Sequence, residues 1–142
     1  MAETFAPEVA GLGTTPTTNA NGGVQGGRVR RFRATVPFDG QGIGDTVVLA
    51  DVPAGYTFAY GVINNTATFG ASATIAIGNS TTAGKYRAAA VQTATGPQLF
   101  GVAGAADDAP LSEAERVILT VGVAALPDSD AFAVVDLYFS AP

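Results

Sequence analysis

The fold is decided by residues 55–90, which read GYTFAYGVINNTATFGASATIAIGNSTTAGKYRAAA. In this segment, short runs of alternating apolar and polar side chains are separated by turns rich in Gly, Asn, Ser and Thr. Alternation with a period of two is typical of a β-strand that buries one face. The segment contains no plausible catalytic group, so the pattern favours a β-sandwich built for contact over an enzyme.

The same pattern continues on both sides of this segment and predicts eight short strands. We expect them at residues 28–36, 45–50, 56–64, 72–77, 85–91, 98–102, 117–123 and 131–140. Eight strands at this spacing indicate an all-β protein, an eight-stranded jelly-roll-like β-sandwich with an extended N-terminal arm. Two alternatives stay open. Without the strand at 98–102 the count would suit an immunoglobulin-like sandwich, and residues 87–90 could equally be helical.

We also predict where three segments interrupt the strands: a strand end at Pro37, a helical turn and a tight turn. Pro37 should end the first strand, because proline cannot donate a hydrogen bond to a ladder. Ser112 and Glu115 fit the S-x-x-E capping box and predict at most one helical turn at 111–116. Residues 127–130, Pro-Asp-Ser-Asp, should form the turn between the last two strands.

The chain divides into two parts of different composition. Residues 1–27 are poor in large apolar groups and rich in Gly, Thr, Asn and Pro, which predicts a flexible or partner-ordered N-terminal arm. Residues 28–142 are expected to form the β-sandwich domain. The arm has two interpretations that stay open: a frayed terminus, or an extended segment that becomes ordered on a neighbouring subunit.

Composition limits the possible partners. Only 13% of the 142 residues are charged, about half the usual ~25%, and a neutral surface suits a protein packed against copies or partners. The net charge of −5 argues against nucleic acid as a partner. The longest apolar runs are far short of the ~20 residues of a membrane helix. The start of the chain lacks a secretory signal, so we expect neither membrane insertion nor export.

Catalysis and metal binding are not expected. The chain has no Cys and no His, which excludes disulfides, thiolate metal sites, and nucleophile–base pairs that rely on either residue. Loop carboxylates could bind Ca²⁺, but Asp107–Asp108 and Asp128–Asp130 match no EF-hand and are interpreted as turn residues. Nothing suggests that Glu113 and Glu115 converge on a cleft. We therefore predict no enzyme activity, no catalytic residue, no cofactor and no metal site.

The positive charges are unevenly distributed. Four of the seven are Arg28, Arg30, Arg31 and Arg33, immediately after the glycine-rich arm. One interpretation is a solvated strand edge, where charge discourages edge-to-edge pairing. The other is a contact with an acidic partner surface, because Arg suits bidentate pairs with carboxylates. Nucleic acid is a poor third interpretation, since four charges without a broader basic face would bind it weakly.

Three segments carry a resemblance to a known group of proteins. They are an apolar strand with a Pro-x-Gly turn (residues 45–55), an Asn-rich turn followed by a strand ending in Ile-Gly (61–78), and Lys-Tyr-Arg-Ala-Ala (85–89). Together with the closing strand Val135–Ser140, they resemble small virion structural proteins of tailed bacteriophages. The resemblance covers residues 45–140 and leaves the first 44 unassigned.

This resemblance implies a capsid decoration (cement) protein. Such a protein is a jelly-roll-like domain that binds the outer surface of a phage head between major capsid subunits, often as a homotrimer. It would be located on the virion and made in the host cytoplasm. From composition, we place the contact with the major capsid protein at the arm and at Arg28–Arg33. A head fibre base, a tail protein, or a non-viral carbohydrate-binding module using Tyr56, Tyr60 or Tyr86 are the alternatives.

Overall fold

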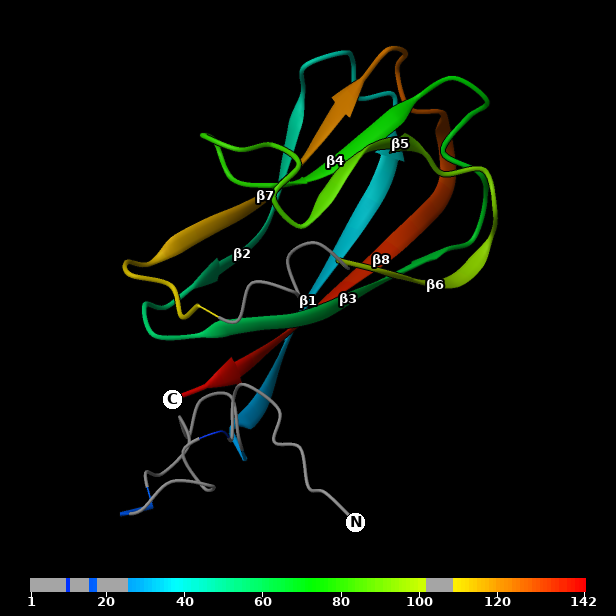
Figure 1. The fold of residues 1–142 in the computed structure, drawn as a ribbon. Coiled ribbons are helices and arrows are strands. Elements are labelled where there is room, and N and C mark those ends of the chain that lie inside the picture. Colours follow the sequence, from blue (N-terminus) through cyan, green and yellow to red (C-terminus); the bar gives the residue numbers. More distant parts are fainter. Residues whose placement is uncertain (1–9, 11–15, 18–25, 102–108) are drawn as a thin grey trace.

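The computed structural model describes residues 10, 16–17, 26–101 and 109–142. Its strands are β1 (Arg28–Asp39), β2 (Thr46–Val52), β3 (Thr57–Asn65), β4 (Thr74–Gly78), β5 (Arg87–Val91), β6 (Gly96–Phe100), β7 (Glu115–Gly122) and β8 (Asp128–Ala141). They form two four-stranded antiparallel sheets, ordered β1-β8-β3-β6 and β2-β7-β4-β5 (Figure 1). Successive strands alternate between the two sheets from β1 to β4 and from β5 to β8, which is the strand order of a jelly roll and confirms the predicted all-β sandwich.

The predicted N-terminal arm falls almost entirely outside the described residues. Within residues 1–27, only 10, 16–17 and 26–27 are described. Whether the arm is flexible or ordered on a partner stays a prediction. The first strand begins at Arg28, immediately after it.

The prediction that Pro37 ends the first strand was wrong. β1 continues through Pro37 to Asp39, with Pro37 opposite Phe132 of β8 and a register shift before Asp39. The reason is the position of β1 at the edge of its sheet, with β8 as its one neighbour there. An edge strand has one side of its backbone unpaired, so a missing N–H can be tolerated.

The predicted helical turn at 111–116 was also wrong. Ser112 and Glu113 form a bend, and Glu115 is already the first residue of β7. The Glu115 carboxylate binds side chains of another segment instead of capping a local backbone. The helical alternative for residues 87–90 fails as well, because Arg87–Val91 is strand β5. At the far end of the chain, β8 starts at Asp128, so most of the turn predicted at 127–130 is strand.

The core lies between the two sheets, and buried and more exposed residues alternate along most strands, whereas β4 is mostly buried and β5 mostly exposed along its length. On β8, Val135, Leu137 and Phe139 are fully buried and point between the sheets. The ring of Phe139 lies edge-on to Phe32 and Phe58, with centroids 5.8 and 5.3 Å apart. These rings fill one end of the sandwich, and the residues between them on each strand face outward.

One glycine of the core is required by close packing. Gly61, in the middle of β3, pairs with Phe100 of β6 on one side and Leu137 of β8 on the other. A Cβ atom at this position would overlap the ring of Phe100. Gly61 therefore lets Phe100 cover the inner face of β3 and fixes where β6 lies.

Candidate interaction surface

Strand alternation divides the four arginines singled out from the sequence. Arg31 and Arg33 pair with Tyr138 and Asp136 of β8 and point outward from the sheet. Arg28 and Arg30 pair with the buried Ala141 and Phe139, so they lie on the opposite face of β1, beyond the end of the core. All four are exposed. The structure therefore brings Arg31 and Arg33 together and separates them from the other two.

Arg31 and Arg33 belong to a continuous row of outward side chains across the sheet. Arg33 lies opposite Asp136, which lies opposite Val62 of β3, which lies opposite Leu99 of β6. One row along, Arg31 lies opposite Tyr138, which lies opposite Tyr60. We call this surface the Arg/Tyr face; its members are Arg31, Arg33, Tyr60, Val62, Leu99, Asp136 and Tyr138.

The middle of the Arg/Tyr face is apolar and ordered by ring stacking. The rings of Tyr60 and Tyr138 are 4.6 Å apart and nearly parallel, at 16°. Leu99 is 77% exposed beside the half-buried Val62. The face therefore combines tyrosine, arginine and exposed apolar side chains, of which Tyr and Arg are enriched at protein–protein interfaces.

The charges of this face are only loosely paired. Arg31 Nε is 3.8 Å from Asp136 Oδ1, and Arg33 Nη1 is 4.0 Å from Asp136 Oδ2, both beyond hydrogen-bond length. Both arginine side chains are 54% exposed. Asp136 Oδ1 is buried and accepts no hydrogen bond from any described residue. Two guanidinium groups thus share one carboxylate and keep donors available to a partner.

Sequence reasoning found the arginines of this surface and missed most of the rest. Tyr60 was considered only for sugar binding, and Tyr138, Asp136, Val62 and Leu99 were not singled out. The one local signal was alternation in Val135–Ser140, which points Asp136 and Tyr138 away from the core. That these residues meet Tyr60 and Arg31 depends on pairing between distant strands.

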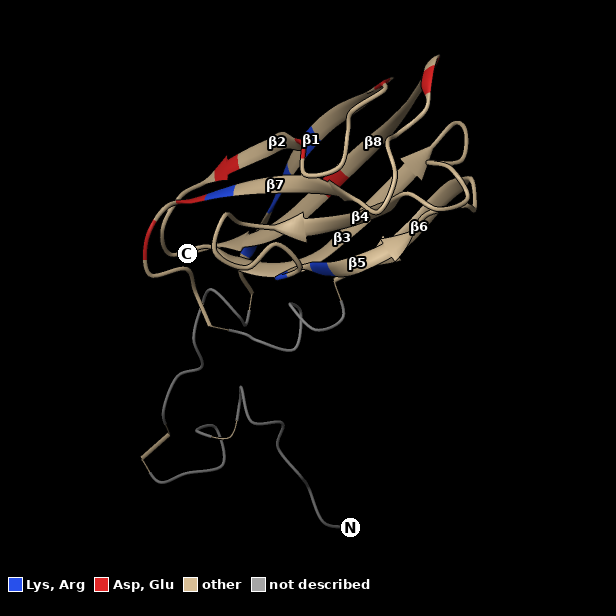
Figure 2. Ribbon diagram, turned by 90° about the horizontal axis from the view of Figure 1, so that it is seen from above, with Lys and Arg blue, Asp and Glu red and all other residues tan. Residues whose placement is uncertain are grey.

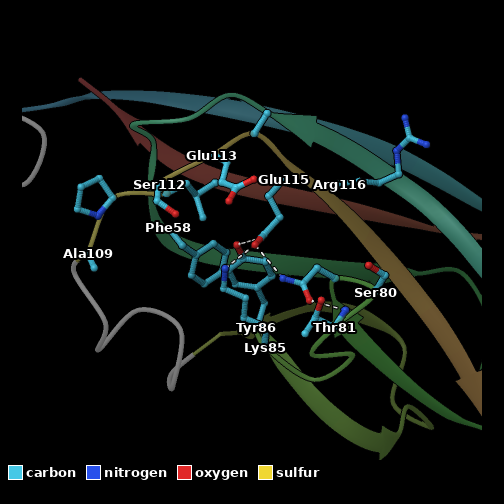
Figure 3. A pocket seen from close by; sticks show the side chains of 14 residues that line it. Phe58, Ser80, Thr81, Lys85, Tyr86, Ala109, Ser112, Glu113, Glu115 and Arg116 are labelled. Carbon is cyan, nitrogen blue, oxygen red and sulfur yellow. Dashed lines mark hydrogen bonds and ion pairs between the residues drawn. The ribbon is translucent and has the colours of Figure 1, made fainter.

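A pocket of about 640 Å³ lies at one end of the sandwich, around Glu115 (Figure 3). The Glu115 carboxylate accepts hydrogen bonds from Lys85 Nζ at 2.5 Å, from Asn79 Nδ2 at 2.9 Å and from the hydroxyl of Tyr86. Its side chain is mostly buried. Burial would raise the pKa of Glu115, but these three hydrogen bonds outweigh it and hold the pKa below its ordinary value. The cluster ties the loop before β5 to the start of β7.

Glu113 and Glu115 both line this pocket, a convergence for which the sequence offered no reason. Glu113 is exposed, whereas Glu115 is held by its three donors. Among the residues that the structure describes, no group of three or more Asp or Glu side chains could hold a metal ion. Asp128 and Asp130 are exposed on β8, and Asp107 and Asp108 lie outside the described residues. In the described ranges no helix is long and apolar enough to cross a membrane.

The three tyrosines considered for sugar binding do not form one platform. Tyr86 is 3% exposed and contacts the Phe58 ring in the core. Tyr56 packs against Phe32, and only Tyr60 lies on the outer surface of a sheet. A flat array of aromatic rings is therefore not assembled from these residues.

Charged residues occupy few positions along the strands, as the colouring of the ribbon in Figure 2 shows. Strands β3, β4 and β6 contain no charged residue, and on β1 the basic side chains are concentrated in its first half. The outer side of the β2-β7-β4-β5 sheet, which we call the neutral face, presents mainly small or uncharged side chains: Thr46, Val48, Thr74, Ala76, Val91, Ile118 and Thr120.

No protein-family model and no curated protein sequence matches this chain. Solved structures do match. A chain of the cyanophage Pam1 capsid asymmetric unit aligns with a TM-score of 0.64 at 17% identity, over 82% of this chain and 86% of that chain. A chain of the Ralstonia phage GP4 capsid aligns with a TM-score of 0.62 at 16% identity, over 82% and 84%.

A third match is a chain of the acidic stable capsid structure of Helicobacter pylori bacteriophage KHP30. Its TM-score is 0.60 at 15% identity, over 80% of this chain and 88% of that chain. Coverage is high on both sides in all three cases, so the matched chains are close to this one in length. At such identities the likeness shows the fold, and the conclusion is that this chain has a jelly roll found in phage capsid structures.

Proposed function

We propose that this chain is a capsid decoration (cement) protein, which binds the outer surface of a phage head between major capsid subunits and stabilises it. The observation that carries the proposal is the match to chains of similar length in three phage capsid structures. The match covers 80–82% of this chain and 84–88% of the matched chains, so the likeness extends over most of both and supports a component of the shell.

The composition of the two outer faces also supports a role in assembly. One face carries exposed aromatic and basic side chains, and the other is almost uncharged. Free monomers usually have a more charged surface. Both features suit a shell component, because its outer faces contact neighbouring subunits in the particle.

A closed homo-oligomer, a homotrimer, is part of this proposal. Rotational closure would hide neutral surface without the open-ended growth that head-to-tail contacts allow. The proposed role is structural, without catalysis, cofactor, nucleic-acid or membrane contact. The arm preceding β1 is proposed as a further contact with the major capsid protein.

The test is to add the purified protein to phage heads that lack it and to image them by electron microscopy. We expect density at regular positions on the outer surface, at a fixed stoichiometry, and heads that withstand a higher temperature before they open. Sedimentation of the free protein at tens of micromolar should report a trimer. Density confined to the tail or to a head fibre would instead assign the chain to that part of the virion, and no binding would overturn the proposal.

A further inference from the structure

The Arg/Tyr face includes two strongly exposed apolar side chains, Tyr60 and Leu99, and two more lie on the same side of the sheet outside it. Eight large apolar side chains are strongly exposed among the described residues, and four of them lie on the outer side of the β1-β8-β3-β6 sheet. They are Val29, Tyr60, Leu99 and Phe132. Exposed apolar groups gathered on one sheet face mark a contact surface more strongly than the same groups scattered singly.

The charge of this face identifies what it contacts. In a chain of net charge −5, the face carries two guanidinium groups and one carboxylate. Because Asp136 lies beyond hydrogen-bond length from both groups, Arg31 and Arg33 can each form a bidentate pair with an incoming carboxylate. The complementary surface therefore places carboxylates beside an apolar patch.

Other occupants fit less well. A second copy related by a two-fold axis through the middle of this face would place the Arg31/Arg33 edge of each copy against the β6 edge of the other, where no carboxylate lies to pair with the guanidinium groups. Nucleic acid would meet two cations and a row of apolar side chains, too little charge for firm binding to phosphates. An acidic protein surface satisfies both the charged and the apolar parts of the face.

We propose that the Arg/Tyr face is the surface by which this protein binds the shell, and that it recognises an acidic protein surface through Arg31 and Arg33 at one edge, Tyr60 and Val62 in the middle and Leu99 at the opposite edge. This inference rests on the proposed function and specifies its contact. It also divides the basic segment: Arg28 and Arg30, on the other side of β1, do not belong to the contact.

The same division supplies a matched control. The variants Arg31→Ser/Arg33→Ser and Arg28→Ser/Arg30→Ser remove the same charge from the same strand, but from opposite faces. We expect the first variant to bind heads that lack the protein at least about tenfold more weakly than the unchanged protein, since charge-assisted hydrogen bonds are lost. The second should differ by less than about twofold. The difference should shrink as salt is raised, because salt screens exposed charges.

Asp136 loses both neighbouring cations in the first variant, which could weaken the fold. A third variant, Arg31→Ser/Arg33→Ser/Asp136→Asn, removes the carboxylate with them and should melt like the unchanged protein while still binding weakly. Binding is measured by cosedimentation with the heads, and melting by circular dichroism.

Each other outcome is decisive. If the unchanged protein does not bind heads, both the proposed function and this inference are wrong. If it binds and the two double variants are weakened equally, or neither is, the Arg/Tyr face is not the contact although the function stands. Binding that disappears after nuclease treatment would identify nucleic acid as the partner. A change of oligomeric state in Arg31→Ser/Arg33→Ser alone would identify a contact between copies. Either result overturns the inference.

Discussion

The two outer faces of this sandwich differ although one rule of alternation builds both. The Arg/Tyr face presents stacked tyrosines, an exposed leucine and two loosely paired arginines. The neutral face presents threonine, alanine and valine, and its arginine, Arg116, is paired with Asp51 at 2.7 Å. Both faces cover the same core.

This difference separates what the fold needs from what a partner needs. Inward residues must be apolar on both sheets, because both line the same core. Outward residues are free of that requirement, so their composition reflects solvent or contacts. On the neutral face, the ion pair of Arg116 with Asp51 and the small side chains are compatible both with exposure to solvent and with contact with a partner. On the Arg/Tyr face, the exposed aromatic and apolar groups indicate a contact surface, and the arginine donors, which water satisfies in the free protein, are available to a partner.

The largest expected effect is on the free energy of unfolding. It comes from a residue that stabilises the fold and belongs to neither outer face. Replacing Glu115 with Ala removes the carboxylate that accepts hydrogen bonds from Asn79, Lys85 and Tyr86 and links them to β7. We expect a loss of about 1–3 kcal/mol in the free energy of unfolding, because hydrogen bonds to a charged group are lost. Below its melting temperature the variant should still bind heads normally, because Glu115 belongs to neither face. Chemical denaturation and cosedimentation check the two parts.

The same cluster should make stability depend on pH. The pKa of Glu115 is below its ordinary value of 4.5 in the folded protein, so the folded state binds its proton less readily than the unfolded state. Glu115 therefore stabilises the fold above about pH 4.5, and its contribution is lost as pH falls through the lowered pKa. Glu115→Gln should show a flatter fall in melting temperature over this acidic range. An unchanged pH profile would contradict the assignment.

An intermediate effect compares the two faces directly. Leu99 on the Arg/Tyr face and Val48 on the neutral face are both more than half exposed. Leu99→Asp should weaken binding to heads about tenfold or more, because the new carboxylate would be desolvated against an acidic surface. Val48→Asp should leave binding unchanged. Both variants should melt within a few degrees of the unchanged protein, and equal effects on binding would remove the distinction between the faces.

The smallest effect concerns the ion pair of the neutral face. Hydrogen bonds from Arg116 lower the pKa of Asp51, but both side chains are 64% exposed, so solvent screens the pair. We expect Asp51→Asn to change neither the melting temperature nor the binding measurably. A clear loss of binding would indicate that the neutral face also contacts the shell.

The fold was largely predictable because its signal is local. All eight predicted strands overlap the observed ones, because alternation between core and solvent is a local signal in most of them, although β4 and β5 lack it. The predictions that were wrong concern positions whose structure depends on residues distant in the sequence. Pro37 continues a strand because β1 is at an edge, and Glu115 leaves its predicted cap because Lys85 and Tyr86 bind it.

The candidate contact was predictable only in part, for the same reason. The sequence by itself determined that this is a β-sandwich with sparse charge and a basic first strand, since composition and period-two alternation need no knowledge of strand order. Only the tertiary structure decided that Arg31 and Arg33 share a face with Tyr60, Tyr138 and Leu99 while Arg28 and Arg30 do not. Those neighbours come from β3, β6 and β8, and long-range strand pairing brings them into register with β1.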